Sequence, residues 1–350
     1  MKREIEAAFL QQAEWCKALG SPFTATLLES ALAVLDETTL TGRMVLNWPG
    51  TAGPLKDVVP LRLAGALHSL VLSGADAKLV ELYPPNIDQV NELATAIVNA
   101  VSVHDRELSS FLDHAPQTNE VSRSSVLIAG LAHIAQQTGL EVEIFEIGAS
   151  GGLNLNLDRF EHRLGPQILG LQGADLRLSP KWIGPVPTVN PKIVERQGCD
   201  LNPLDVSDIA QVLRLLSYVW PDQPERLART RKAITIAQKY PPNLIKADAA
   251  DWVEKVFKSE PTKGRVRVLV HSIAWQYMPN NVQERITNAI ETAGKIATLA
   301  APIAWLAFEL DANGKSNLRI RSWPQKSGWS ILAKANPHVH DIEWLPASAK

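Results

Sequence analysis

Three carboxylate side chains follow successive segments that are expected to form β-strands. Glu146 lies at the end of the alternating apolar run 142–147, Asp200 follows the strand candidate 192–199 with its apolar pair Ile193-Val194, and Asp248 follows the strand candidate 243–247. Parallel strands end at one edge of a sheet, so the three acids are expected to face a common ligand there. A carboxylate suits a ribose because its two oxygens can accept hydrogen bonds from two neighbouring hydroxyls. A ribose is therefore a ligand that such an acid can bind; the alternative is that each acid caps the following helix.

A glycine-rich turn, Gly148-Ala-Ser-Gly-Gly152, follows the first of these strands. Glycine adopts positive φ and lets the backbone approach a ligand closely. Backbone N–H groups of the turn are therefore expected to meet the polar part of a ligand. The spacing Glu-x-Gly-x-Ser-x-Gly resembles the first motif of S-adenosylmethionine-dependent methyltransferases. This resemblance implies that S-adenosylmethionine is the cofactor and that its amino-acid part is bound by Glu146, Gly148, Ser150, Gly152 and Asn154. It also implies that Asp200 accepts hydrogen bonds from the ribose and that Asp248 with Ala249 lies near the adenine.

A further apolar run, 266–271, ends in polar and aromatic residues. In a methyltransferase-like sheet this end faces the reactive part of the cofactor. His271 is therefore expected to be a general base and a cofactor contact, with Ser272 as a second contact and Tyr277 as a catalytic residue. A buried histidine satisfied by a backbone carbonyl is the alternative for His271. The chain lacks the Asp/Asn-Pro-Pro-aromatic tetrad of many amino-group methyltransferases, which favours an oxygen or carbon acceptor on a small molecule.

Two other functions fit the same segment. The sequence Gly148-Ala-Ser150-Gly-Gly152 matches the Gly-x-Ser-x-Gly nucleophile elbow, and an aspartate (Asp248 or Asp251) and His271 follow in the order of a hydrolase triad. A serine hydrolase with Ser150 as nucleophile is therefore a second hypothesis. A third is a protein that binds a ligand on this fold without catalysis.

Substrate contacts are expected from two further segments. Asn119, Glu120 and Arg123 lie near a helix start with spacing that could reach over a substrate cleft, although capping and an exposed ion pair would explain them as well. Asp158 and Arg159, which come soon after the glycine turn, are assigned to the substrate too. No metal site is expected, because His338 and His340 could share a strand face but two ligands do not make such a site.

The elements that would position these residues fall into two regions. Residues 1–137 are predicted to form an all-helical cap, a lid over the strand ends, with helices at 3–19, from 21, at 60–73, 84–113 and 119–139, and a loop at 41–59. Residues 138–350 are predicted to form a Rossmann-like, methyltransferase-type, mostly parallel sheet, so the fold class is α/β. Its strands are expected at 142–147, 192–199, 243–247, 266–271, 303–309, 317–323 and 329–344, the last broken around Pro337. Helices are expected at 207–219, 223–239, 249–258 and 280–293, and an insertion at about 157–190.

Composition narrows the function classes. The net charge of −2 gives no strong attraction to nucleic acid or to an anionic membrane. Cys16 and Cys199 form no metal or redox spacing, and no uncharged apolar run approaches the ~18–20 residues of a membrane span. We therefore expect a cytoplasmic protein whose partner is a small molecule, with neither nucleic acid nor membrane; the oligomeric state stays open.

Short segments over nearly the whole chain resemble the bacterial family called domain of unknown function 2332. They are Gly65-Ala-Leu-His68, Gln117-Thr-Asn-Glu-Val-Ser-Arg123, Glu146-Ile-Gly-Ala-Ser-Gly-Gly-Leu-Asn-Leu155, Gly198-Cys-Asp-Leu-Asn-Pro-Leu-Asp205, Val219-Trp-Pro-Asp-Gln223 and Val270-His-Ser272. The resemblance implies no established activity. It implies a sheet similar to that of Rossmann-like methyltransferases, and with it a possible cofactor site.

Overall fold

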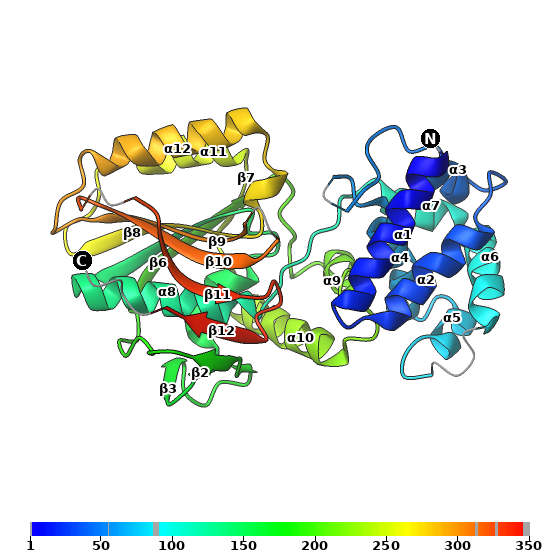
Figure 1. Ribbon diagram of the computed structural model, residues 1–350, viewed down its shortest axis with the longest axis horizontal. Coiled ribbons are helices and arrows are strands. Elements are labelled where there is room, and N and C mark those ends of the chain that lie inside the picture. Colours follow the sequence, from blue (N-terminus) through cyan, green and yellow to red (C-terminus); the bar gives the residue numbers. More distant parts are fainter. Residues whose placement is uncertain (1, 55, 87–90, 312–313, 326–327, 346–350) are drawn as a thin grey trace. The chain divides into compact units, whose positions relative to one another are not determined.

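The computed structural model describes residues 2–54, 56–86, 91–311, 314–325 and 328–345. The chain divides into two compact units, which consist of residues 1–118 with 207–231 and of residues 119–206 with 232–350. The helix α10 (Pro224–Lys239) begins in the first unit and ends in the second. Each unit has its own buried core. Figure 1 shows the helices and strands of both units.

The first unit is helical over its described residues. Its helices are α1 (Lys2–Ala18), α2 (Pro22–Val34), α3 (Leu40–Leu46), α4 (Val59–Ser73), α5 (Ala77–Leu82), α6 (Leu93–Val103), α7 (Asp105–Leu112) and α9 (Ile209–Ser217). Helix α4 is apolar on nearly all sides, and its Leu63, Leu67 and Leu70 are fully buried. A helix with this pattern must lie inside a bundle, and the neighbouring helices supply the rest of the core.

Two predictions for this unit are wrong in detail. The expected loop 41–59 contains most of α3, because the side chain of Thr39 accepts a hydrogen bond from the Gly42 amide and starts a helix there. The expected single helix 84–113 is interrupted at His104, where the backbone leaves helical geometry between α6 and α7. The adjacent Asp105 side chain accepts hydrogen bonds from the Leu40 and Thr41 amides at 2.7 Å, which fixes the break. Residues 87–90 of that expected helix lie outside the described residues.

The second unit contains a nine-stranded mixed sheet in the order β5-β12-β11-β10-β9-β8-β1-β6-β7. The strands are β1 (Glu141–Ile147), β5 (Lys181–Ile183), β6 (Ile193–Asp200), β7 (Leu244–Lys246), β8 (Arg265–Ser272), β9 (Ile303–Leu310), β10 (Ser316–Trp323), β11 (Ser330–Ala335) and β12 (Asp341–Trp344). The seven predicted strand segments are confirmed, and so are the helices α9, α10, α11 (Ala249–Phe257) and α12 (Asn280–Gly294). The protein is therefore an α/β protein in which a largely parallel sheet follows N-terminal helices.

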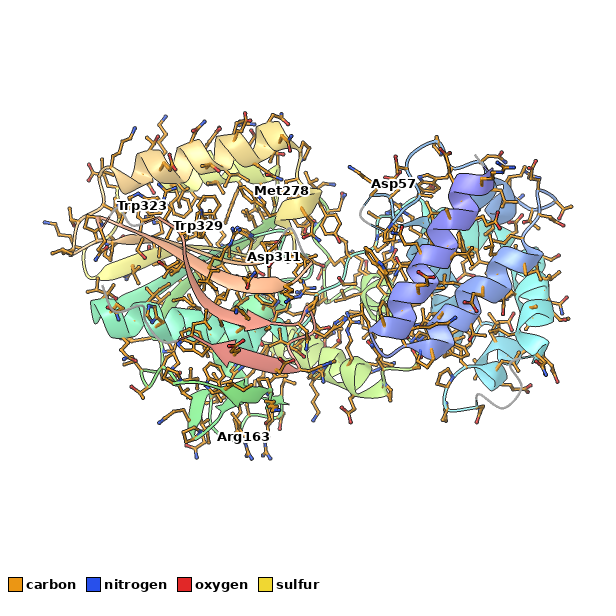
Figure 2. All side chains as sticks on the ribbon, in the orientation of Figure 1. Asp57, Arg163, Met278, Asp311, Trp323 and Trp329 are labelled. Atoms are coloured by element: carbon orange, nitrogen blue, oxygen red, sulfur yellow. The ribbon has the colours of Figure 1, made fainter. Side chains whose placement is uncertain are left out.

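The parallel strands form one half of this sheet. Strands β9, β8, β1, β6 and β7 pair in parallel in that order. Along the chain, the sheet grows from β1 through β6 to β7 on one side and then from β8 to β9 on the other, so the order reverses between β1 and β8. Met278 and Asp311, which follow β8 and β9, lie toward one end of the sheet in Figure 2, and Trp323 of the antiparallel β10 lies toward the other.

Helices cover both faces of the sheet. Successive residues of β1 point to opposite faces: Ile144 packs with α8 (Arg123–Thr138), and Phe145 packs with α11. Helices α11 and α12 lie on one side of the strands and α8 on the other (Figure 1). Helix α8 begins at Arg123 rather than at Asn119 as predicted. The Asn119 and Glu120 side chains bind other segments, as described below, and so do not start a helix.

The predicted insertion forms extended structure. Strands β2 (Glu161–Leu164), β3 (Gln167–Gly170) and β4 (Arg177–Leu178) make a small separate sheet, and β5 joins the edge of the large sheet beside β12. The 3-10 helix η2 (Leu153–Arg159) connects the glycine turn to this insertion.

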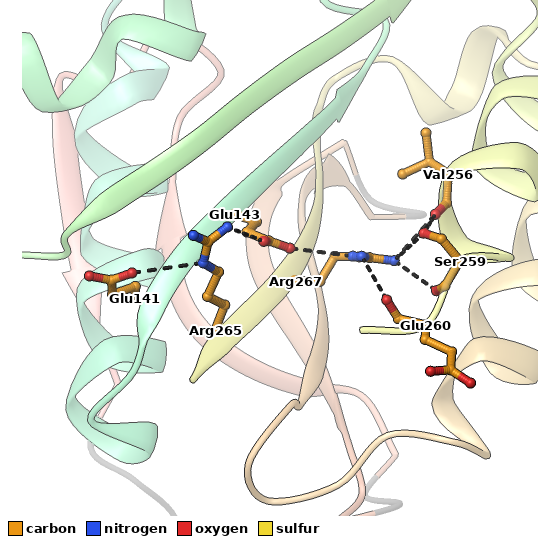
Figure 3. Close-up of polar contacts among 7 residues, drawn as sticks. All are labelled: Glu141, Glu143, Val256, Ser259, Glu260, Arg265 and Arg267. Carbon is orange, nitrogen blue, oxygen red and sulfur yellow. Dashed lines mark hydrogen bonds and ion pairs between the residues drawn. The ribbon is translucent and has the colours of Figure 1, made fainter. Parts of the chain in front are cut away.

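A chain of ion pairs lies at the beginning of β1 and β8 (Figure 3). The buried Glu143 carboxylate binds Arg265 at 3.1 Å and Arg267 at 3.5 Å. The guanidinium of Arg267 also donates to the carbonyls of Val256 in the last turn of α11 and of Ser259 and Glu260 just after it. These bonds satisfy carbonyl groups at the end of a helix, so Glu143 and Arg267 fix α11 to the sheet at the end opposite the candidate site.

Candidate functional site

The reversal of the strand order defines where a ligand site belongs in this sheet. In open α/β sheets the crevice lies outside the carboxyl ends of the strands at the point where the order reverses. Here this point is bounded by the glycine turn after β1 and by the loop 273–278 after β8. The two segments touch, because a Cβ atom added to Gly148 would lie 2.7 Å from the Cβ of Ala274.

Among the described residues of the second unit, three residues other than glycine have positive φ, and all three lie in loops that border this point. Ser150 (φ 53°) is in the turn after β1, Ile273 (φ 48°) follows β8, and Val339 (φ 52°) follows His338. Such conformations are costly for residues with side chains, and they concentrate at functional sites. Their positions agree with the site that the strand order indicates.

Backbone amides in and directly after the glycine turn donate hydrogen bonds to other groups of the protein. Gly148 and Gly152 adopt φ of 66° and 67°. The Ala149 and Gly152 amides donate to backbone carbonyls. The Ser150 amide donates to Asp200 Oδ2 at 2.9 Å, and the Leu153 amide donates to Asn119 Oδ1 at 2.9 Å. The expectation that the turn offers its amides to a ligand is therefore wrong for these four groups.

Two side-chain oxygens at the turn, unlike these four amides, have no hydrogen-bond partner in the part of the chain that the structure describes. The Ser150 hydroxyl is buried and has no hydrogen-bond partner among the described residues, and the same holds for the Asn154 side-chain oxygen. The amide nitrogen of Asn154 donates to the Glu120 carbonyl at 3.4 Å. A buried polar atom without a partner is costly, and at a crevice it is a group that a ligand can satisfy.

Glu146, next to the turn, is a buried carboxyl group with 3% of its surface exposed. Its pKa is raised to about 8, mainly because burial disfavours the charged form and secondly because the Asp200 carboxylate is near; the Arg123 guanidinium opposes both effects. At neutral pH the protonated form of Glu146 therefore predominates. A strongly shifted carboxyl group beside a crevice is a marker of functional sites.

Asp200 is positioned by two backbone amides, one from each side. Its Oδ2 accepts from Ser150 and its Oδ1 accepts from Asn202, both at 2.9 Å. The turn after β1 and the carboxylate after β6 are thus parts of one structure. Asp248 instead accepts from the Ala250 and Asp251 amides and caps α11, as the helix-cap alternative predicted. Its role near an adenine, with Ala249 as the first residue of α11, stays a prediction.

His271 is buried and both of its ring nitrogens are bound within the protein. The Trp305 indole N–H donates to His271 Nε2 at 2.8 Å. An indole nitrogen only donates, so Nδ1 carries the proton and donates to Glu309 Oε1 at 2.7 Å. The general-base role predicted for His271 stays a prediction, and it would require one of these bonds to break. Tyr277, in the short 3-10 helix η3 (Trp275–Tyr277), is 54% exposed.

The segment before α8 contacts the site at several points. Arg123 donates to the carbonyls of Ser272, the last residue of β8, and Pro337. Glu120, which is 2% exposed, binds the Ser122 amide at 3.1 Å and His338 Nδ1 at 3.2 Å. The structure therefore brings these sequence-selected residues together with the turn. His338 becomes part of the candidate site through its contact with the Glu120 carboxylate.

Asp158 and Arg159 have other partners. Asp158 forms a two-bond ion pair with Arg196, with distances of 2.6 and 2.9 Å. The guanidinium of Arg159 lies 3.8 Å from the centre of the Tyr240 ring. Their proposed contact with a substrate stays a prediction, as does the lid function of the N-terminal helices.

Glu309 is the main site residue that the sequence reasoning missed. It lies near the end of β9 after the apolar run 303–308, and it is 97% buried. A carboxylate closing an apolar strand was the signal that selected Glu146, so the same rule would have found Glu309. Among the described residues no group of three or more His, Cys, Asp or Glu side chains could hold a metal ion, and no helix in the same residues has the length and apolar character needed to cross a membrane.

These features define an α/β protein with a candidate ligand site at the reversal point of a largely parallel sheet. The chain belongs to the DUF2332 family, described as an uncharacterized protein conserved in bacteria, and the match covers residues 6–344. The family expected from the sequence is thereby confirmed. Comparisons with curated proteins and with solved structures gave no match.

Proposed function

We propose that this protein is an S-adenosylmethionine-dependent methyltransferase that acts on an oxygen or carbon atom of a small molecule. The observation that carries the proposal is the reversal of strand order between β1 and β8, with a glycine turn after β1 bonded to the carboxylate after β6. The five parallel strands run third, second, first, fourth and fifth across the sheet, which is the order of a doubly wound nucleotide-binding fold.

The chemistry of the turn favours a ligand without phosphates. A pyrophosphate needs open backbone N–H groups at the turn, and four amides there already have protein acceptors. The Asp200 carboxylate and the side-chain oxygens of Ser150 and Asn154, which have no partner among the described residues, are acceptors, and the charge of Asp200 disfavours an anion. A sulfonium nucleoside, with a positive charge and an amino group, fits these acceptors better than a dinucleotide does.

Each residue receives a role under this proposal. Glu146, Gly148, Ser150, Gly152 and Asn154 would surround the amino-acid part, Asp200 would accept the ribose hydroxyls, and Asp248 with Ala249 would border the adenine. His271 and Ser272 would lie beside the reactive end. The bound sulfonium supplies an activated methyl group, so the protein contributes mainly by holding the acceptor in line with it.

A serine hydrolase with Ser150 as its nucleophile is the second candidate function. Its positive φ of 53° is the kind of strain found at a nucleophile elbow. Its hydroxyl, however, has no hydrogen-bond partner in the described residues, so no base is in place to activate it. Labelling of the wild type by a fluorophosphonate, with no labelling of Ser150→Ala, would favour the hydrolase.

Thermal denaturation with different ligands tests the proposal. S-adenosylhomocysteine at 100 times its dissociation constant should add about 2.7 kcal/mol to the stability of the folded protein, a shift of several degrees. NAD should give no shift in melting temperature, because the amides that would bind its pyrophosphate already have acceptors within the protein. The absence of any shift at millimolar S-adenosylhomocysteine would overturn the methyltransferase proposal. A shift without methyl transfer to any acceptor tested would favour the ligand-binding alternative.

A further inference from the structure

The loop 273–278 after β8 forms one border of the candidate site, and the buried Glu309 side chain on β9 holds the first part of it. Glu309 Oε1 accepts hydrogen bonds from the Ala274 amide at 3.0 Å, the Trp275 amide at 3.3 Å and His271 Nδ1 at 2.7 Å. Three donors from β8 and its loop thus meet on one oxygen of the neighbouring strand. Bonds to a charged acceptor are stronger than neutral ones, so this oxygen is a strong polar attachment for the start of the loop.

Aromatic contacts and a second side chain fix the remaining parts of the loop. The Trp275 ring stacks on His271, with centroids 5.2 Å apart and an angle of 20° between the planes. Trp305 meets Trp275 edge-on and donates to His271 Nε2. On the other side, the Gln283 side chain of α12 donates to the carbonyls of Trp275 and Met278. Through these bonds the loop has one defined shape.

That shape decides how the loop meets the glycine turn. Ala274 is the residue whose Cβ would lie 2.7 Å from a Cβ placed on Gly148, so the loop and the turn touch at Ala274. The preceding Ile273 has a positive φ of 48°, a conformation that an isoleucine keeps only when its surroundings impose it. The bonds to Glu309 begin at the next residue and supply part of that constraint.

We propose that Glu309 is a positioning residue for the candidate cofactor site, because it holds the loop 273–278 against the Gly148 turn. This inference rests on the proposed function for its effect on a ligand, but its effect on the loop can be measured without one. Glu309 acts through the backbone of Ala274 and Trp275 and through His271. The buried histidine orients the carboxylate and supplies the surface on which Trp275 stacks.

Two substitutions of Glu309 distinguish a residue that positions the loop through hydrogen bonds from one that only fills space in the core. Glu309→Leu keeps the approximate volume and removes all three acceptor bonds. Glu309→Gln keeps an oxygen at the position of Oε1 and replaces Oε2 by a nitrogen. Oε2 has no hydrogen-bond partner among the described residues, so this replacement breaks no bond there. The matched control is Glu143→Leu, because Glu143 is a similarly buried carboxylate (2% exposed against 3%) at the other end of the same parallel strands.

Hydrogen–deuterium exchange of the Ala274 and Trp275 amides and calorimetric titration with S-adenosylhomocysteine are the two measurements. Loss of hydrogen bonds to a charged group should speed exchange and weaken binding about tenfold or more in Glu309→Leu. Glu309→Gln keeps an acceptor oxygen but not the charge, so it should lie between the wild type and Glu309→Leu in both measurements. Glu143→Leu should destabilise the fold but leave the ligand affinity of the folded protein unchanged.

The outcomes separate the two proposals. Unchanged exchange of the two amides in Glu309→Leu would overturn the inference, whatever the ligand does. Faster exchange with unchanged affinity would also overturn it, because the loop would then not border the bound ligand. If the wild type binds no S-adenosylhomocysteine, the proposed function fails, and the exchange experiment alone decides whether Glu309 holds the loop.

Discussion

The ionisation of Glu146 should make the stability of the protein fall as pH rises through the neutral range. The pKa of Glu146 is about 8 in the folded protein against an ordinary value of 4.5. A carboxyl group with a raised pKa binds its proton more tightly in the folded state. Its stabilising contribution is therefore complete below pH about 4.5 and is lost as pH rises through about 8.

The magnitude follows from proton linkage. Between those two pH values unfolding releases one proton from Glu146, so the free energy of unfolding falls by about 1.4 kcal/mol per pH unit. From pH 5.5 to 7.5 this amounts to roughly 3 kcal/mol, a sizeable part of the stability of an ordinary domain. Glu146→Gln has no proton to lose in this window and should remove that part of the slope.

Urea unfolding at pH 5.5, 6.5 and 7.5, followed by tryptophan fluorescence, measures the effect. Seven of the ten tryptophans belong to the sheet unit, so the signal reports mainly on it. Glu254→Gln is the control, because hydrogen bonds from Arg285 lower the pKa of Glu254 and its titration lies below the window. Equal slopes for the wild type and Glu146→Gln would refute the reasoning and show that Glu146 is already ionised in the folded protein.

Two further substitutions test the contacts at the two ends of β1. Glu143→Leu leaves the buried Arg267 guanidinium with only carbonyl and hydroxyl partners, so it should lower the free energy of unfolding in urea by about 3 kcal/mol or more. The same change at the partly exposed Glu141 should have a much smaller effect. Equal losses of stability in the two variants would contradict this account. Gly148→Ala should lower the affinity for S-adenosylhomocysteine at least about tenfold, because a left-handed backbone costs roughly 1–2 kcal/mol for alanine and the new methyl group meets Ala274. Gly139→Ala has a similar φ of 69° with nothing within 4 Å, so it should keep the affinity, and a shared loss would show that strain alone is responsible.

Local sequence pattern was enough to predict most of the sheet. The strands β1 and β8 show apolar residues in alternation or in short runs, and β9 is almost wholly apolar, patterns that are typical of strands. The short helix α3 was not predicted: besides its local cap Thr39, its start depends on the Asp105 side chain, which binds the Thr41 amide from 64 positions further along the chain. A local pattern contains no information about such a distant partner.

The same limit applies to the candidate site. Glu146 and the glycine turn were visible because they are adjacent in sequence. The pairing of Glu309 with His271 depends on the register of β8 and β9, and the pairing of Glu120 with His338 joins residues 218 positions apart. Sequence reasoning therefore chose His271 as a general base without the information that Trp305 and Glu309 bind both of its nitrogens.

The central claim is that the nucleoside and amino-acid parts shared by S-adenosylmethionine and S-adenosylhomocysteine bind at the carboxyl ends of β1 and β6. Calorimetric titration of S-adenosylhomocysteine into the wild type, Asp200→Asn and Asp175→Asn tests this claim most directly. The exposed Asp175 lies between β3 and β4 of the small separate sheet and is the control. We predict one binding site in the wild type and in Asp175→Asn, and an affinity lower by roughly tenfold to a hundredfold in Asp200→Asn, the range for hydrogen bonds to a charged group. No binding to the wild type at millimolar ligand, or equal affinity in Asp200→Asn, would contradict the account.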